Sequence, residues 1–261
     1  MTESTIELPA ASPPREPASG PILFARYAFG PNRLGYCGSD AVDELFAGAT
    51  VAHDDRALRE LAKTFEGAWP YLELIARAND MPDPLDRRVV EAYWLGNSLL
   101  DVVSPKLMAD SLTDRFRPHL KPNAWHWLGD KAGTGGVPVH AFHVLDVFPR
   151  VGLLRSGSTD DALRVMDSCR IRWGRVLERD GESLVVNAVP LAMIDGKLAL
   201  GAARAERVEA WRDGAAFVEG VGVGDIVSIH WSWACDRLTP ARLADLAWWT
   251  ERQITVANQT I

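Results

Sequence analysis

Cysteine is scarce in this sequence, and long apolar runs are missing. Three cysteines among 261 residues are an odd number and too few for a disulfide framework, so we expect free thiols or metal ligands in a reducing compartment. No apolar run approaches the roughly 20 residues that a membrane-spanning helix requires. The N-terminus also lacks a basic segment followed by an apolar one, which a signal peptide needs. These absences predict a cytoplasmic protein that makes no contact with membranes.

Basic charge is also in short supply. The chain has 28 Lys and Arg residues against 35 Asp and Glu, which gives a formal net charge of −7, and the basic residues are scattered along the chain. A surface that follows a phosphate backbone needs basic residues gathered on one face, so nucleic acid is excluded as an expected partner. The hydrophobic content of 47% is enough for a globular protein with a real core.

The first part of the chain divides into a tail and a helical domain. Residues 1–20 contain four prolines and few apolar residues, so they cannot offset the entropy lost on ordering and should form a disordered tail. Residues 21–165 predict a mainly helical domain, because apolar residues recur at helical spacing in the segments 22–29, 42–46, 54–75, 84–95, 105–116 and 160–166. The stripe over 54–75 predicts one continuous helix, and Gly30-Pro31-Asn32 predicts the end of the first helix.

One long connection, residues 118–150, is rich in glycine and proline and carries four of the six histidines. A long loop with aromatic and histidine side chains is more often functional than a simple linker. Its segment VPVHAFHV alternates and predicts a strand, on which His140 and His143 point to opposite faces. We therefore do not expect both to bind one ion, and we name Cys37, His126, His140 and His143 as members of a possible second site.

From residue 166 to 261 the apolar period changes to two, which is typical of strands. Asp180-Gly181 and Asp195-Gly196, which separate alternating segments, are strong signals for hairpin turns. Short strands at this spacing predict a small OB-like antiparallel β-barrel, and Thr239-Pro240 begins a terminal helix. The expected fold class is therefore α+β, with the mainly α-helical domain followed by the barrel and its C-terminal helix.

Two short segments of the barrel share a further pattern. The first strand is expected to open at Cys169, and Gly174 and Val176 follow it at five and seven residues. The last strand and its continuation follow the pattern G-D-x-V-x-V-H-x-G-x-A-x-x-R/K-L, with matching places at Gly224, Asp225, Val227, Ile229, His230, Ala234, Arg237 and Leu238. On these motifs, residues 166–258 resemble the HypC/HupF family of NiFe-hydrogenase maturation chaperones. The helical domain resembles an uncharacterised family associated with actinobacterial hydrogenase genes.

The resemblance implies a function and a pair of site residues. In the family, the matching cysteine and histidine hold iron that carries cyanide and carbon monoxide before it passes to the hydrogenase large subunit. For this chain it implies that Cys169 and His230 hold such iron, and that the partners are the immature large subunit or other maturation proteins. The sequence departs from the family where Arg172-Trp173 replaces Ile-Pro, where Ser232 replaces the glycine of the second pattern, and where the cysteine is internal instead of terminal. The spacing from Cys169 to His230 is also about ten residues longer than in the family, which predicts enlarged hairpins.

The same pair suits a metal on chemical grounds alone. A thiolate is a strong ligand for Fe(II) and a neutral imidazole a moderate one, and two protein ligands leave positions open for diatomic molecules. Cys169 and His230 are thus the predicted iron ligands. We expect the protein to be a metallochaperone more than a catalyst. One alternative is an iron-dependent enzyme that uses His126, His140 and His143 to produce a diatomic ligand or to modify a small metabolite. The other is a metal-free scaffold that binds proteins.

Overall fold

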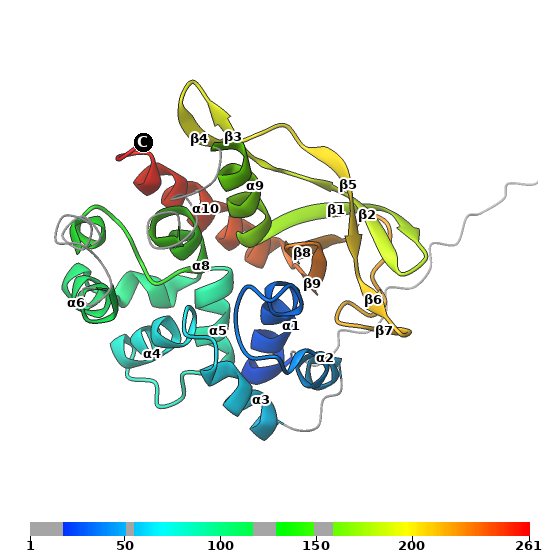
Figure 1. The fold of residues 1–261 in the computed structure, drawn as a ribbon, viewed down its shortest axis with the longest axis horizontal. Coiled ribbons are helices and arrows are strands. Elements are labelled where there is room, and N and C mark those ends of the chain that lie inside the picture. Colours follow the sequence, from blue (N-terminus) through cyan, green and yellow to red (C-terminus); the bar gives the residue numbers. More distant parts are fainter. Residues whose placement is uncertain (1–17, 51–54, 117–128, 149–158) are drawn as a thin grey trace, which may run out of the picture.

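The computed structural model describes residues 18–50, 55–116, 129–148 and 159–261. Helices fill the first part of the chain, and strands follow from Arg172 until a final helix ends the chain (Figure 1). This arrangement confirms the α+β class. Residues 1–17 of the predicted tail and His126 of the predicted loop lie outside the described residues.

The helices follow the predicted segments with several shifts. In chain order they are α1 Gly20–Arg33, α2 Val42–Thr50, α3 Asp55–Lys63, α4 Trp69–Ala78, α5 Arg87–Trp94, the 3-10 helix η1 Ser98–Val102, α6 Pro105–Phe116, α8 His140–Phe142, the π-helical η2 His143–Val147, α9 Thr159–Cys169 and α10 Pro240–Ala257. The last of these begins where the sequence predicts, because the Thr239 side chain accepts a hydrogen bond from the Arg242 backbone N–H and Pro240 occupies the first turn.

The prediction of one continuous helix over 54–75 is wrong. The structure has two helices there, since α3 ends at Lys63 and α4 begins at Trp69. Pro70 lies within the apolar stripe, and inside a helix its ring would clash with the carbonyl four residues earlier. The proline instead occupies the first turn of a new helix, where its missing N–H costs nothing.

Helix α1 occupies the centre of the helical part and is buried along most of its length. It packs against α2, α3 and α5 and also reaches the strands β8 and β9. The predicted end at Gly30 is wrong, because the helix continues through Pro31 to Arg33. A proline inside a helix leaves one carbonyl without its helical partner, and here that carbonyl finds a partner outside the helix, as described below.

Five strands pair in a ring. They are β1 Arg172–Asp180, β2 Ser183–Ala188, β5 Arg204–Glu209, β9 Trp233–Arg237 and β8 Ile226–His230, in the order of pairing, and β8 pairs in turn with β1. The prediction of a purely antiparallel sheet is wrong at one place, since β5 and β9 run parallel where Glu209 pairs with Trp233. An odd number of strands cannot alternate in direction all the way around a ring, so at least one parallel pair is required.

Two short hairpins lie outside this ring: β3 Leu191–Ile194 with β4 Lys197–Leu200, and β6 Trp211–Arg212 with β7 Ala215–Ala216. Asp195 and Gly196 connect β3 to β4 with φ values of 51° and 75°. Positive φ at both residues is what a two-residue type I′ turn requires. The hairpins predicted at Asp195-Gly196 and at Asp180-Gly181 are both confirmed.

The expected position of Cys169 at the start of the first strand is wrong. Cys169 ends α9, and β1 begins at Arg172. The helix extends this far because the Arg170 backbone N–H still bonds the carbonyl of Met166, and the fully buried Arg170 side chain pairs with Asp167 at 3.0 Å. His230 ends β8, as predicted for its strand, but β9 follows it.

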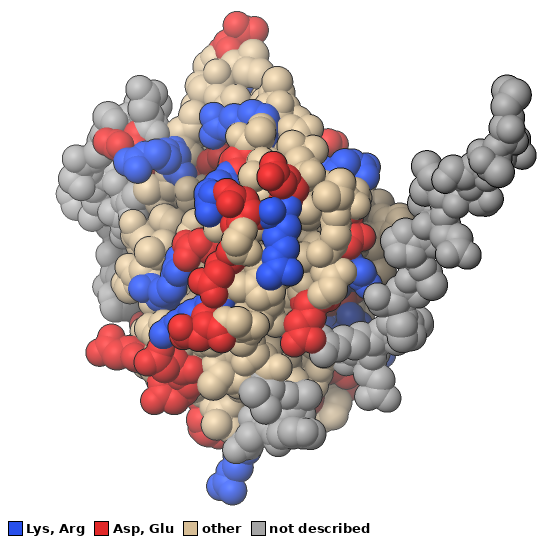
Figure 2. Space-filling view, turned by 90° about the vertical axis from the view of Figure 1, so that its right-hand side faces the viewer, with Lys and Arg blue, Asp and Glu red and all other residues tan. Residues whose placement is uncertain are grey.

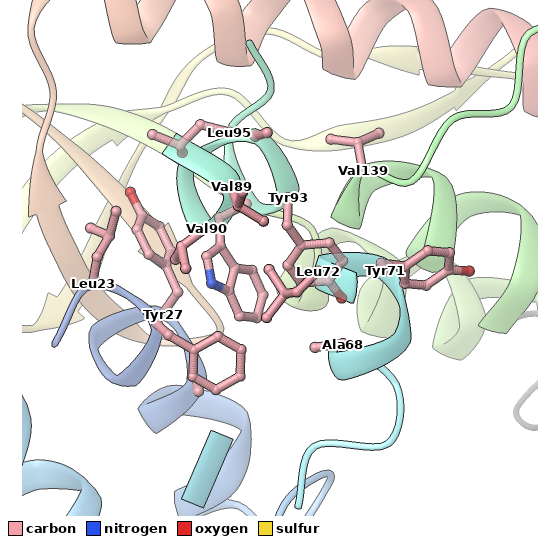
Figure 3. Close-up of a cluster of buried hydrophobic side chains, with 14 of the residues drawn as sticks. Leu23, Tyr27, Ala68, Tyr71, Leu72, Val89, Val90, Tyr93, Leu95 and Val139 are labelled. Carbon is pink, nitrogen blue, oxygen red and sulfur yellow. The ribbon is translucent and has the colours of Figure 1, made fainter. Parts of the chain in front are cut away.

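One hydrophobic core joins the helices to the sheet. Phe29 of α1 packs against Phe217 and Trp233, with ring centroids 5.5 and 4.8 Å apart. The same core continues between α1, α4 and α5, where Figure 3 shows Tyr27 and Tyr93 among the buried aliphatic side chains. The helices and the ring of strands therefore depend on each other for part of their buried surface.

The predicted domain boundary between residues 165 and 166 falls inside α9. This helix packs on β3 and η2, and Met166 shares a further apolar cluster with Val144, Leu191 and Ile254.

The surface of one face carries interspersed acidic and basic side chains without a continuous basic stripe (Figure 2). Among the described residues, none of the helices combines the length and apolar character needed to cross a bilayer.

Candidate metal centre

Three potential metal ligands meet where the helices contact the ring of strands. His140, Cys169 and His230 each offer one ligand atom, and these atoms all lie within 4.8 Å of one another. They come from α8, from the end of α9 and from the end of β8. The two histidines are buried, at 5% and 1% exposure, and Cys169 is partly exposed. The structure thus brings together the two residues that the sequence pairs, and it adds His140 from the possible second site.

The imidazole of His230 is held in one tautomer by helix α1. Its Nδ1 lies 2.6 Å from the backbone carbonyl of Tyr27, and because a carbonyl can only accept, Nδ1 carries the proton. This carbonyl is free to accept because Pro31, four residues later, has no N–H for the usual helical bond. The other nitrogen, Nε2, is buried and has no hydrogen-bond partner among the described residues. His230 therefore presents a buried lone pair, as a metal ligand must.

A glycine allows α1 to come this close to the strand end. An ideal Cβ on Gly30 would lie 2.6 Å from the carbonyl oxygen of His230, which is far inside van der Waals contact. Only glycine can be accommodated here without a backbone shift. Gly30 and Pro31, read from the sequence as a helix end, together place the Tyr27 carbonyl on the His230 ring.

His140 is fixed by two hydrogen bonds. Its Nε2 lies 2.8 Å from the carbonyl of Cys169 and therefore donates, while Nδ1 lies 3.1 Å from the Tyr93 hydroxyl and therefore accepts. The lone pair of His140 is therefore on Nδ1, where it accepts from the Tyr93 hydroxyl. The first bond also ties His140 directly to the backbone of Cys169.

Burial keeps all three side chains neutral near pH 7. Burial raises the pKa of the Cys169 thiol to about 12, with a further contribution from the Cys37 thiol, and the Trp231 indole acts in the opposite direction. Burial lowers the pKa of His140 to about 4, against the effect of its hydrogen bond to Cys169. Burial and the neighbouring His140 hold the pKa of His230 well below its usual value. Both imidazoles are thus in their ligand form, whereas the thiol must release a proton to bind a metal.

Aromatic side chains surround the cluster. The ring of Trp94 lies 4.7 Å from that of His140 and 5.5 Å from that of His230, measured between centroids. On the more exposed side, Trp231 stacks on Tyr36 at 4.1 Å, and Tyr36 is 52% exposed. Apolar walls of this kind exclude water and strengthen metal–ligand electrostatics.

The remaining predicted site residues lie outside the cluster or outside the described residues. Cys37 lies near enough to raise the pKa of Cys169, but it is not among the three ligands that lie within 4.8 Å of one another. His143 contacts the Tyr71 hydroxyl at 3.5 Å, and its ring centroid lies 6.5 Å from that of His140. His126 falls in the segment that the structure does not describe. Among the described members of the predicted second site, Cys37, His140 and His143 do not form one group of metal ligands.

The predicted strand over VPVHAFHV is wrong, because His140 and His143 lie on the consecutive helical turns α8 and η2. Nearly every residue of these turns is buried, so their apolar alternation does not mark one face of a strand. Asp146 of η2 forms a buried ion pair of 3.1 Å with Lys131. The helical form is what turns His140 toward Cys169 and His230.

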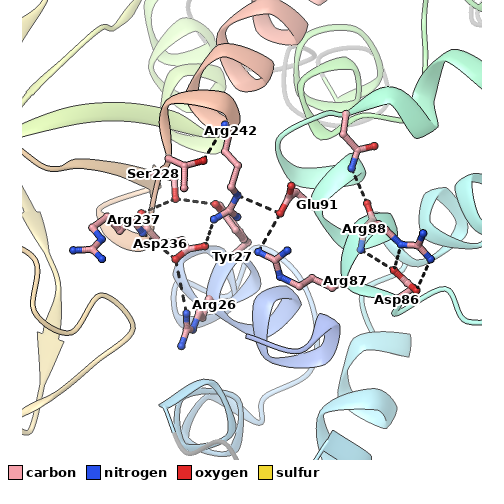
Figure 4. A network of polar contacts seen from close by, with 12 residues as sticks. Arg26, Tyr27, Asp86, Arg87, Arg88, Glu91, Ser228, Asp236, Arg237 and Arg242 are labelled. Atoms are coloured by element: carbon pink, nitrogen blue, oxygen red, sulfur yellow. Dashed lines mark hydrogen bonds and ion pairs between the residues drawn. The ribbon is translucent and has the colours of Figure 1, made fainter. Parts of the chain in front are cut away.

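A buried polar network links the elements that hold His230. The Tyr27 hydroxyl and the Ser228 hydroxyl lie 2.8 Å apart, and Ser228 donates to the carbonyl of Asp236. The Asp236 carboxylate accepts from Arg242 of α10 at 2.7 Å, and Arg242 also pairs with Glu91 of α5 at 3.2 Å (Figure 4). Because the network spans α1, α5, α10 and both strands, it fixes the position of α1 against β8.

Comparison with known proteins gives one family. No curated protein matches the chain, and no solved structure matches it. One family model matches residues 16–261, a range that contains the helices, the ring of strands and all three residues of the cluster. The chain therefore belongs to the family of unknown function DUF6390.

Proposed function

We propose that this protein binds a transition-metal ion through His140, Cys169 and His230 and acts as a metallochaperone. The observation that carries the proposal is the convergence of one sulfur and two imidazoles within 4.8 Å. The unpartnered, buried Nε2 of His230 supports it, because a buried nitrogen without a hydrogen bond costs free energy unless a ligand satisfies it. The neutral state of both imidazoles favours metal over proton binding at neutral pH.

The ligand set limits the metals that fit. One thiolate with two imidazoles suits first-row ions of intermediate softness, among them iron, zinc and copper, and excludes the oxygen-loving calcium and magnesium. Three protein ligands also leave at least one coordination position free, as in catalytic and carrier sites and unlike closed structural zinc sites. Among these ions we propose iron.

The cargo we propose is iron carrying cyanide and carbon monoxide, for delivery to the large subunit of a NiFe hydrogenase. The HypC-like motifs support this, because Cys169 lies just before β1, and β1 pairs with the strand that ends at His230. In this proposal the ring of strands corresponds to the OB-like barrel of that family, and α10 corresponds to its terminal helix. The third ligand, His140, comes from outside the HypC-like segment and therefore has no counterpart in the HypC-like motifs.

Release of the cargo is compatible with the site. Cys169 is its most exposed ligand, and its thiol returns to the neutral form once a metal leaves, because burial raises its pKa to about 12. A partner that offers stronger thiolate ligands can therefore take the ion from the side of Cys169. A cytoplasmic location, where thiols stay reduced, belongs to the same proposal.

The test is anaerobic purification from a hydrogenase-producing host, followed by metal analysis and infrared spectroscopy in the cyanide and carbonyl stretching region. We expect about one iron per chain and bands in that region, both lost in Cys169→Ala. Cys235→Ala is the matched control, because Cys235 is fully buried and lies outside the cluster. Bound iron without these infrared bands would contradict the proposed cargo. A metal content that Cys169→Ala leaves unchanged would contradict the proposed site.

A catalytic role is the second candidate, favoured by the free coordination position of a three-ligand site. In that case the iron-loaded protein turns over a small molecule without a partner protein. Two results together would show that the protein is an enzyme and not a carrier: hydrogenase activity that survives deletion of the gene, and multiple turnovers by the isolated protein.

A further inference from the structure

Trp231 connects the candidate metal centre to the surface. It directly follows His230 in the chain, and its ring stacks on that of the half-exposed Tyr36, with centroids 4.1 Å apart and planes inclined by 19°. Its indole N–H is buried and has no nitrogen or oxygen acceptor among the described residues. The acceptor that it does have is the sulfur of Cys169. One indole thus meets both the predicted thiolate ligand and an aromatic ring at the surface.

The backbone of Trp231 adopts a conformation that is unfavourable for a bulky residue. Trp231 is the first of two residues in the turn between β8 and β9, and its φ of 55° is in the left-handed region. Glycine is favoured at such a turn position, so the turn alone does not explain a tryptophan here. Strain of this kind persists only where surrounding contacts hold the residue, and it is concentrated at functional sites.

The contacts that hold Trp231 also fix it relative to Cys169. The Trp231 backbone N–H donates to the Ser168 carbonyl at 2.7 Å, and Ser168 immediately precedes Cys169 at the end of α9. The Trp231 carbonyl accepts from Arg172, three residues after Cys169, at 2.7 Å. The indole donor and the sulfur acceptor are therefore positioned by the same short stretch of chain.

A hydrogen bond to a metal-bound thiolate changes the electronic state of the ion. The donor withdraws electron density from the sulfur, which lowers the energy of the sulfur lone pairs and stabilises the lower oxidation state of the metal. The effect is strong in a buried site, because the local dielectric is low. Trp231 is thus placed to act on a bound ion through the sulfur, without binding the ion itself.

We propose that Trp231 is a positioning residue for Cys169, whose N–H···S hydrogen bond orients the sulfur and favours the ferrous over the ferric state of bound iron. The inference rests on the proposed metal site and names a residue that regulates it. Ferrous iron exchanges its ligands faster than ferric iron, which suits a carrier that must release its ion. In the ferric–ferrous couple the ion takes up one electron from an external one-electron donor, no bond is made or broken, and the indole keeps its proton.

Cobalt(II) loading tests the hydrogen bond, because a thiolate-to-cobalt charge-transfer band reports the energy of the sulfur lone pairs. The full-length wild type should show this band. Trp231→Phe keeps an aromatic ring beside Tyr36 but lacks the N–H donor, so its band should lie at lower energy. Trp231→Gly relaxes the left-handed backbone and also lacks the donor, so its band should move in the same direction and by a similar amount.

Iron loading tests the effect on the oxidation state. The midpoint potential of the ferric–ferrous couple, measured with redox mediators, should be more negative in Trp231→Phe than in the wild type, because the ferrous form loses stabilisation. Trp248→Phe is the control for both measurements, because Trp248 is a half-exposed tryptophan on α10 outside the cluster. Its band energy and its potential should equal those of the wild type.

The outcomes distinguish this inference from the proposed function. Absence of a thiolate-to-cobalt band in the wild type would overturn the metal site itself. A band of equal energy in the wild type and in Trp231→Phe would overturn the role of the indole N–H and leave the metal site standing. A shift in Trp231→Gly alone would overturn it too, since the ring and not its N–H would then act on the sulfur. A potential that does not fall in Trp231→Phe would overturn the preference for ferrous iron.

Discussion

Pro31 affects the site because it cannot donate a helical hydrogen bond. Because Pro31 lacks an N–H, the Tyr27 carbonyl is available to accept from Nδ1 of His230. Hydrogen bonds of this kind set the tautomer and orientation of a metal-binding histidine. From the sequence alone, Pro31 predicts only the end of a helix. Whether the Tyr27 carbonyl accepts a hydrogen bond depends on which strand lies across from it.

Replacing Pro31 by alanine tests this role. Pro31→Ala supplies a helical N–H that competes for the Tyr27 carbonyl, so the His230 ring loses part of its restraint. We expect metal affinity to fall by about 10- to 100-fold, measured by competition with a chromophoric chelator. Pro70→Ala is the control, because Pro70 lies in the first turn of α4, where no helical bond is affected. Equal affinity in both variants would contradict the proposed orientation of His230.

Metal binding should also release a proton from Cys169. The pKa of the thiol is about 12 and that of His140 about 4, so between pH 6.5 and 8.5 only the thiol exchanges a proton on binding. We expect close to one proton released per ion and an affinity that rises roughly tenfold per pH unit. Calorimetric titrations in buffers of different ionisation enthalpy measure the proton directly. A value near zero would mean that the sulfur is not a ligand.

At the scale of elements, the sequence locates most helices and hairpins but mistakes four segments, the first of which is the end of α1, placed at Gly30 instead of Arg33. The apolar stripe over 54–75 predicts one helix, but the chain has a break before Pro70. The alternation over VPVHAFHV predicts a strand, but the segment forms two helical turns. The period-two pattern also begins too early, so that Cys169 is placed on a strand instead of at the end of α9. Short buried segments cannot be assigned from periodicity, because all of their faces are apolar.

These errors explain what was found and what was missed at the site. Cys169 and His230 are identifiable from spacing and motif, and the structure places them together. His140 is assigned to a separate group because its segment reads as a strand, and because nothing in the sequence shows that α8 packs against the end of α9. Gly30 is the clearest missed signal, since its role is a close approach between α1 and β8 that only coordinates reveal.

The contact between α1 and the strand end can be tested at Gly30. A Cβ there meets the His230 carbonyl at 2.6 Å, so Gly30→Ala should push α1 away from β8. We expect a loss of about 1–3 kcal/mol in the free energy of unfolding together with weaker metal binding. Gly133→Ala is the control, because a Cβ at Gly133 has no neighbour within 4 Å. Should both variants unfold at the same denaturant concentration, the close approach would not be energetically important.

For the whole molecule, the shared core and the buried histidines make stability sensitive to acid. His140 has a folded-state pKa of about 4, and that of His230 is also lowered by burial. An unfolded histidine titrates near pH 6.5, so below this pH the unfolded chain binds protons that the folded chain does not. The contribution of the neutral histidines is therefore complete above about pH 6.5 and decreases as the pH falls toward 4.

For chelator-treated protein we expect the free energy of unfolding to fall by about 1.4 kcal/mol per pH unit for each histidine over this range. Urea unfolding at several pH values measures the slope, and His140→Gln should reduce it. A slope that is unchanged in His140→Gln would show that this histidine is not buried in its neutral form.

The central claim is that one sulfur and two imidazole nitrogens bind the same ion. X-ray absorption at the metal edge of the loaded protein tests it most directly. The account predicts one sulfur scatterer at about 2.3 Å and two imidazole nitrogens at about 2.0–2.1 Å for a zinc-like ion. The sulfur should be lost in Cys169→Ser, and one imidazole should be lost in His140→Gln. A spectrum without sulfur, or one that neither variant changes, would contradict the account.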